Sequence, residues 1–136
     1  MVDAPAIRRL NPEALGTPPG YSQVVEVRAQ RLIFISGQTA TDADGNIVGK
    51  GDFAAQAEQV FANLSAALEA VGCTAGDLVK LTVFLREMEN LAAYRVARNR
   101  FLATVTPAAA PAVTLVEVSR LYGPEFLIEI EAVAAG

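Results

Sequence analysis

Two glutamates near the C-terminus are the side chains of this sequence best suited to acid–base chemistry. They lie in the segment "LIEIEAVAA", residues 127–135. In an extended strand, Glu129 and Glu131 share one face, and the isoleucines beside them share the other face with Ala132. A polar outer face is the ordinary arrangement of such a strand, but a positioned carboxylate can also accept a proton from water. Residue types alone favour the solvated face and leave a functional role for one glutamate open.

Few other side chains offer reactive groups. The sequence has one cysteine, Cys73, and no histidine. A single cysteine excludes an internal disulfide and fits a reducing compartment, and a nucleophilic thiol usually needs a basic partner such as histidine. We therefore expect Cys73 to be structural. The lack of histidine also removes the Ser-His-Asp triad and the common zinc sites.

The composition narrows the class of protein further. The 136 residues carry a net charge of −4, and 52% of them are hydrophobic. We expect a single domain over residues 1–136. The acidic balance argues against nucleic-acid binding, no apolar run approaches the ~18 residues of a membrane span, and the N-terminus lacks the apolar core of a signal peptide. These features predict a cytoplasmic homo-oligomer whose interfaces use the apolar excess.

Periodicity predicts the elements that would position the glutamates. Strands are expected at residues 21–27, 31–37, 78–85, 112–119 and 126–134. Helices are expected at residues 53–71, capped by Asp52, and 91–103, capped by Asn90. The order β-β-α-β-α-β-β predicts an α+β fold in which two helices pack on one face of one mixed sheet.

The opposite face of that sheet has no helix left to cover it. We expect Phe34, Phe84 and Leu115 on this face, where a second subunit would cover them. The three arginines within residues 95–100 form the only local basic cluster of the sequence. We expect them on a solvated face of the second helix.

Five segments, taken in order, resemble the Rid/YjgF family of reactive-intermediate deaminases, whose members are also described as L-PSP endoribonucleases. They are "GYSQVVEV", "LIFISGQ", "NLSAALEAVGCTAGDLVKLTVFL", "PAVTLVEVSRL" and "IEIEAVA". The resemblance covers nearly the whole chain and implies a chorismate-mutase-like fold and a homotrimer with ligand clefts between subunits. It also implies hydrolysis of enamines and imines, such as 2-aminoacrylate, to a 2-oxo acid and ammonia, without a metal or an organic cofactor.

The resemblance also implies roles for single residues. Tyr21 matches the aromatic residue at the cleft, and Ser36 and Gly37 match the backbone segment that contacts the ligand. Leu115 matches a position whose main chain holds ligand and water. Glu129 matches the acid that positions the attacking water, whereas Glu131 is expected to belong to the scaffold or an interface.

The sequence departs from the family at Val113. Typical deaminases of the family read Pro-Ala-Arg-Ser/Thr where this chain reads "PAVT", residues 111–114. The family arginine makes a two-pronged contact with the substrate carboxylate, which a valine cannot copy. Val113 therefore predicts changed substrate anchoring at this part of the cleft.

Other arginines are candidates for the missing anchor. Arg120 follows seven residues after Val113, but family members often carry a basic residue there, which favours a structural role. Arg28, Arg31 and Arg86 stand at strand ends and could reach a cleft from a neighbouring subunit.

Two classes of function stay open. The first is an enzyme, a deaminase of small enamines or imines with changed substrate anchoring. The second is a trimer that binds a small metabolite or regulates a partner without turnover, which Val113 favours. A ribonuclease is poorly supported because the chain is acidic and lacks histidine, and a chorismate mutase would need several cationic groups in the cleft.

Overall fold

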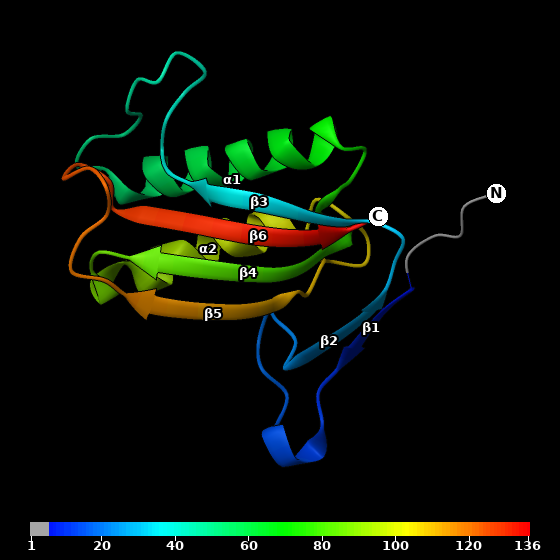
Figure 1. Ribbon diagram of the computed structural model, residues 1–136. Coiled ribbons are helices and arrows are strands. Elements are labelled where there is room, and N and C mark those ends of the chain that lie inside the picture. Colours follow the sequence, from blue (N-terminus) through cyan, green and yellow to red (C-terminus); the bar gives the residue numbers. More distant parts are fainter. Residues whose placement is uncertain (1–5) are drawn as a thin grey trace.

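The computed structural model describes residues 6–136 and confirms the α+β class (Figure 1). Its strands are β1 (Ala6–Leu10), β2 (Val24–Arg28), β3 (Leu32–Gln38), β4 (Leu78–Leu85), β5 (Ala112–Glu117) and β6 (Ile128–Ala135). Its helices are α1 (Phe53–Ala70) and α2 (Leu91–Leu102), with short 3-10 turns at Glu13–Leu15, Ala75–Asp77 and Met88–Asn90. The expected domain begins at residue 1, and its first five residues lie outside the described part of the chain.

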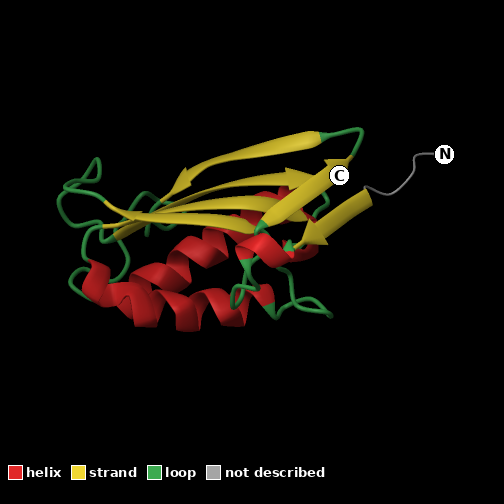
Figure 2. Cartoon of the chain, turned by 90° about the horizontal axis from the view of Figure 1, so that it is seen from below, coloured by secondary structure: helices red, strands yellow, loops and turns green. Residues whose placement is uncertain are grey.

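The main sheet has four strands in the order β3-β6-β4-β5. Strands β4 and β5 run parallel, and β6 is antiparallel to both of its neighbours, β3 and β4. Figure 2 shows both helices on one face of this sheet and no helix on the other. The predicted two-layer arrangement, with one open sheet face, is therefore confirmed.

The alternation of side chains along the two central strands builds the core. The large aliphatic side chains of β4 and β6 that are fully buried are Leu78, Leu81, Val83, Leu85, Ile128 and Ile130. They pack with the inner side of α1, where Leu64 and Leu68 are also buried. Because buried and exposed positions alternate along β6, both of its glutamates face away from this core.

The ends of the helices follow local sequence signals. A side-chain oxygen of Asp52 accepts a hydrogen bond of 3.1 Å from the backbone N–H of Ala55, so the predicted cap of α1 is confirmed. Gly72 follows α1 with φ of +74°, a conformation that favours glycine. Asn90 stands at the N-cap of α2 but makes no capping hydrogen bond, because a 3-10 turn leads directly into this helix.

The expected single sheet is wrong in one respect. The segment expected at 21–27 forms β2, but β2 pairs with β1 in a separate two-stranded sheet rather than with β3. An isolated bridge between Ser22 and Ala112 connects this hairpin to the start of β5. Strand β1 was not expected because its sequence, "AIRRL", carries two adjacent arginines and no apolar alternation.

Two side chains lie on a different side from the one expected. Leu115 aligns with the buried Val83 in the parallel β4–β5 pair, so it packs against the core instead of lying on the open face with Phe34. Arg98 is only 6% exposed, whereas a solvated helix face was expected. It stacks over the ring of Tyr94 at 5.7 Å, and two of its nitrogens donate to the side-chain oxygen of Asn99.

None of the helices within residues 6–136 combines the length and the apolar character that a bilayer crossing requires.

A fully buried glutamine ties the loop before β6 to α1. The side-chain nitrogen of Gln56 donates to the carbonyl oxygens of Gly49 and Glu125 at 3.1 and 2.8 Å. Its side-chain oxygen accepts from the backbone N–H of Leu127 at 2.8 Å. One side chain therefore satisfies three backbone groups and fixes the entry into β6.

Replacing Gln56 with leucine should leave these three backbone groups without partners at a buried site. We expect Gln56→Leu to lower the free energy of unfolding by about 2–4 kcal/mol, measured by urea denaturation. Glu58→Gln, on the exposed side of the same helix, is the control and should change it by less than about 0.5 kcal/mol. Equal stabilities of the two variants would contradict the role assigned to Gln56.

Candidate functional site

A bulge in β3 brings the candidate residues Ser36 and Gly37 next to β6. Pairing between the strands runs from Ile35 with Ala132 to Gln38 with Ile130. Three residue steps on β3 thus match two steps on β6, so one extra residue is accommodated around Ser36 and Gly37. Bulges of this kind re-aim backbone and side chains and are frequent beside active sites.

The carboxylate of Glu129 lies directly over Gly37. A methyl group at position 37 would overlap the Oε2 atom of Glu129. Glycine is therefore required for this close approach of a side chain to the backbone. Ser36, Gly37 and Glu129, which were selected separately from the sequence, form one group on the open side of the sheet.

The environment of Glu129 alters its acidity. Partial burial raises the pKa of the Glu129 carboxyl above its usual range, and the negative charge of Glu131 adds to this shift. A carboxyl with a raised pKa is more readily protonated near neutral pH, which suits general acid–base work. The shift separates Glu129 from an ordinary solvated carboxylate.

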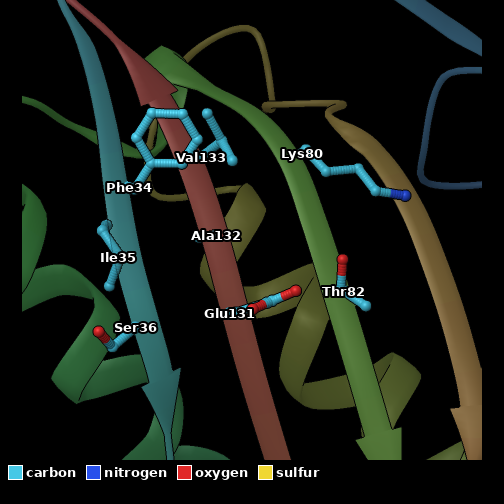
Figure 3. A pocket seen from close by; sticks show the side chains of 8 residues that line it. All are labelled: Phe34, Ile35, Ser36, Lys80, Thr82, Glu131, Ala132 and Val133. Carbon is cyan, nitrogen blue, oxygen red and sulfur yellow. The ribbon is translucent and has the colours of Figure 1, made fainter.

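Glu131 lines a neighbouring hollow on the open face of the sheet (Figure 3). The hollow has a volume of about 430 Å³ and is lined by Phe34, Ile35, Ser36, Lys80, Thr82, Glu131, Ala132 and Val133. Figure 3 shows Glu131 extending from β6 toward Thr82 of β4. The Lys80 amine donates to the hydroxyl of Thr114. The side chain of Glu131 therefore extends across a polar patch of the open face.

The remaining candidates lie at the other edge of the sheet. Val113 aligns with the buried Leu81 in the β4–β5 pair, and Val113 and Leu115 both pack against the core on the helix side. Tyr21 is half-buried and precedes Ser22, whose N–H donates to the carbonyl oxygen of Pro111 at 3.1 Å.

The structure thus divides the candidate residues into two groups. Ser36, Gly37 and Glu129 lie at β3 and β6 on the open side of the sheet, whereas Tyr21, Val113 and Leu115 lie at or beside β5, the opposite edge strand. Within one chain, the two groups do not meet.

The loop before β6 adds a contact that sequence patterns did not indicate. The hydroxyls of Tyr122 and Thr39 lie 2.7 Å apart, so the loop is hydrogen-bonded to the residue that follows β3. The ring of Tyr122 also packs against Phe126, with ring centroids 4.8 Å apart. The hydrogen bond between Thr39 and Tyr122 therefore links the end of β3, which carries Gly37, to the loop before β6, which carries Glu129. Only the fold brings Thr39 and Tyr122 together, because 83 residues separate them.

Metal ligation finds no support in the described residues. Within 6–136, no three histidine, cysteine, aspartate or glutamate side chains come together in a way that could hold a metal ion.

Comparison with known proteins identifies the family. The sequence model of the family described as "Endoribonuclease L-PSP" matches residues 11–136. The chain is 40% identical over 114 residues to a RutC family protein of Pyrococcus horikoshii, which covers 84% of this chain and 85% of the relative. It is 37% identical over 123 residues to the 2-iminobutanoate/2-iminopropanoate deaminase of Escherichia coli, with 90% of each chain covered.

Solved structures agree with this result. A Rid family protein from Yersinia pestis, YyfB, superposes with a TM-score of 0.87 at 37% identity and covers 96% of this chain and 98% of its own. The YjgF gene product of Escherichia coli superposes with a TM-score of 0.70 at 35% identity, covering 88% and 90%. The chain therefore belongs to the Rid/YjgF family, which carries the L-PSP endoribonuclease description.

The close approach of Gly37 and Glu129 yields a prediction. Gly37→Ala should displace the Glu129 carboxylate, because the new methyl group and Oε2 cannot occupy the same space. We expect a crystal structure of this variant to show Glu129 in another rotamer, with the four-stranded sheet retained. Gly76→Ala is the control, since its new methyl group would meet no atom closer than 3.4 Å. An unmoved Glu129 in Gly37→Ala would contradict the described geometry.

The raised pKa of Glu129 yields a second prediction. Burial disfavours the ionised carboxylate, so ionised Glu129 destabilises the folded protein. This loss of stability is small at a pH below the ordinary glutamate pKa of 4.5, and it is complete at a pH above the raised pKa of Glu129. Glu129→Gln should therefore raise the thermal midpoint near pH 7, and the gain should shrink as the pH falls toward about 4.

Glu87→Gln, at an exposed position after β4, provides the matched control and should show no such pH-dependent gain. A gain from Glu129→Gln that is the same at both pH values would show that the ionisation of Glu129 is not its cause.

Proposed function

We propose that this protein is a hydrolytic deaminase of small imines and enamines that carry a carboxylate. The observation that carries the proposal is the half-buried Glu129, with its raised pKa, seated over Gly37 at the β3 bulge. Relatives from Escherichia coli and Salmonella typhimurium, each 37% identical over 123 residues, are named 2-iminobutanoate/2-iminopropanoate deaminases. The names of these relatives support the hydrolysis of a C=N bond, and the Glu129 carboxylate supports the presence of an acid–base group for it.

In the proposed reaction, Glu129 positions the water and transfers its protons. The water oxygen bonds to the imine carbon while Glu129 takes one proton, which then passes to the nitrogen. From the resulting carbinolamine, a second proton moves from the hydroxyl to the nitrogen, the C–N bond breaks, and a 2-oxo acid and ammonia leave. An enamine enters the same path after tautomerising to the imine. Backbone groups of Ser36 and Gly37 would hold the substrate in place.

We further propose that the active protein is a homotrimer with ligand clefts between subunits. Phe34 and Leu32 of the open sheet side are 75% and 56% exposed, as expected of residues that a second subunit covers. Within one chain, Glu129 is separated from Tyr21, Val113 and Leu115. A cleft that contains both groups would therefore need Tyr21, Val113 and Leu115 from a neighbouring subunit. In this arrangement, Tyr21 and the Leu115 main chain contact the ligand from the second subunit.

A non-catalytic trimer that binds a small metabolite is the second candidate. Val113 favours it, because valine offers no charge to a substrate carboxylate at the position where family deaminases are expected to carry arginine.

The deaminase proposal predicts different roles for the two glutamates of β6. Glu129→Gln should lower the rate of 2-iminobutanoate hydrolysis by about 10²–10⁴-fold, since the amide cannot accept a proton from water. Glu131→Gln should lower it less than about threefold, because Glu131 takes no part in the proposed proton transfer. The assay follows the imine, generated in situ from a 2-amino acid, against its uncatalysed decay. Equal rates for the two variants would show that Glu129 is only a polar residue on the outer face of β6. An inactive wild type would favour the trimer that binds a metabolite without turnover.

The trimer proposal predicts a solution mass of three times 14.3 kDa by light scattering coupled to size exclusion. Phe34→Glu should dissociate it, because a charge would then have to be buried in the interface. Glu87→Lys, at an exposed position after β4, is the control and should leave the mass unchanged. A wild type that stays monomeric at micromolar concentration would contradict the intersubunit cleft.

A further inference from the structure

A pocket lined by two arginines lies beside the entry into β6. Its volume is about 410 Å³, and it is lined by Arg86, Ser119, Arg120, Leu121, Tyr122 and Pro124. The loop residues come from the connection between β5 and β6, and Arg86 directly follows β4. The lining has two positive charges and no acidic side chain.

The guanidinium of Arg86 is incompletely satisfied. Its Nε atom is buried and has no hydrogen-bond partner among the described residues. The side-chain ion pairs within residues 6–136 are Arg8–Glu26 and Lys50–Glu125, so neither Arg86 nor Arg120 has a carboxylate partner there. A buried donor without an acceptor is costly and rare in folded proteins, and it calls for a ligand or a water.

Strand register places Arg86 close to the group around Glu129. Phe84 of β4 pairs with Glu129, and the backbone N–H of Arg86 donates to the carbonyl oxygen of Leu127 at 3.1 Å. Arg86 therefore stands diagonally across from Glu129 on neighbouring chain segments. Diagonal neighbours of this kind have Cα atoms about 7–8 Å apart, within the reach of a long side chain.

We propose that Arg86 and Arg120 bind the carboxylate of the substrate and replace the arginine that this chain lacks at Val113. The inference rests on the proposed deaminase function and adds the anchor to it. A guanidinium matches a carboxylate through two parallel hydrogen bonds, and no carboxylate of residues 6–136 is paired with the guanidinium of Arg86 or Arg120. A 2-imino acid held in this way has its C=N carbon one bond from the anchored carboxylate, on the side toward Glu129.

The pocket is held in shape before any ligand arrives. Tyr122 is hydrogen-bonded to Thr39, and Gln56 holds the carbonyl oxygen of Glu125 and the N–H of Leu127. The middle of the arginine-bearing loop and its end before β6 are therefore tied to other elements. A preformed anchor loses less conformational entropy when it binds a small anion.

The buried Arg98 is less suited to this role. Asn99 already accepts hydrogen bonds from two of its nitrogens, at 3.2 and 3.0 Å, and Tyr94 stacks against its guanidinium. Arg98 also belongs to α2, which lies on the helix-covered face of the sheet, whereas Glu129 faces the open side. The Arg86–Arg120 pocket, by contrast, lies at the end of β4, the strand that pairs with β6 and its Glu129.

The test compares Arg86→Met and Arg120→Met with Arg95→Met, which removes an exposed arginine of α2. We expect each pocket variant to raise KM for 2-iminobutanoate about ten- to a hundredfold, with a smaller effect on kcat, and Arg86→Lys to retain part of the affinity. Arg95→Met should match the wild type. Thermal midpoints and solution masses establish that each variant is folded and assembled.

Binding measured by NMR titration separates this inference from the proposed function. The wild type should bind 2-oxobutanoate more tightly than its uncharged analogue butanone, and Arg86→Met should remove that preference. This result would support the anchor even in a protein that does not turn over the imine. Turnover with an unchanged KM in both pocket variants would overturn the anchor and leave the deaminase proposal intact. The anchor is equally overturned if the wild type does not bind 2-oxobutanoate, or if Arg98→Met alone raises KM.

Discussion

The burial of Ile128 and Ile130 is the constraint on which the rest of the site depends. Both side chains are fully buried in β6, which lies between β3 and β4 in the middle of the sheet. A slip of one residue in this strand would turn both isoleucines out and bury two glutamates, at a cost that the core could not offset. The apolar face of β6 thus fixes Glu129 on the open side, opposite Phe84 and over Gly37.

Beside this fixed strand, small local features determine how Ser36, Gly37 and Glu129 are arranged. Position 37, in the bulge of β3, has no side chain, and that space admits the Glu129 carboxylate. Partial burial and the neighbouring Glu131 then raise the pKa of Glu129. Each feature opposes stability, since an ionised carboxylate prefers water and a bulge loses regular pairing. Proteins commonly retain such costs where a site requires them.

Much of this arrangement could be predicted from the sequence, because the main signals are local. The alternation in "LVKLTVFL" gave β4 at its observed bounds, Leu78–Leu85, and the three- and four-residue spacing gave α1. The side from which Leu115 projects could not be predicted, because it depends on the parallel register with Val83 of another strand. The pairing of β2 with β1 was missed for a similar reason, since strand partners are chosen by tertiary structure.

The candidate site shows the same limit. Glu129 and Glu131 are equivalent in the alternating pattern, and only the family resemblance distinguished them in the sequence. In the fold their surroundings differ: Glu129 lies over Gly37, whereas Glu131 lines the open hollow. The burial of Arg98 and the contact between Thr39 and Tyr122 likewise arise from elements far apart in sequence. Local sequence patterns predict which element each residue belongs to, and long-range packing decides which side chains come into contact.

A crystal structure of the protein with 2-oxobutanoate, the product of 2-iminobutanoate hydrolysis, tests the role of Glu129 most directly. We expect the ligand carboxylate on Arg86 and Arg120, and the carbonyl carbon facing the Glu129 carboxylate across a space that fits one water. A ligand bound elsewhere, for example beside Val113, with its carbonyl carbon too far from Glu129 for one water to bridge them, would contradict the assignment of Glu129 as the hydrolytic group.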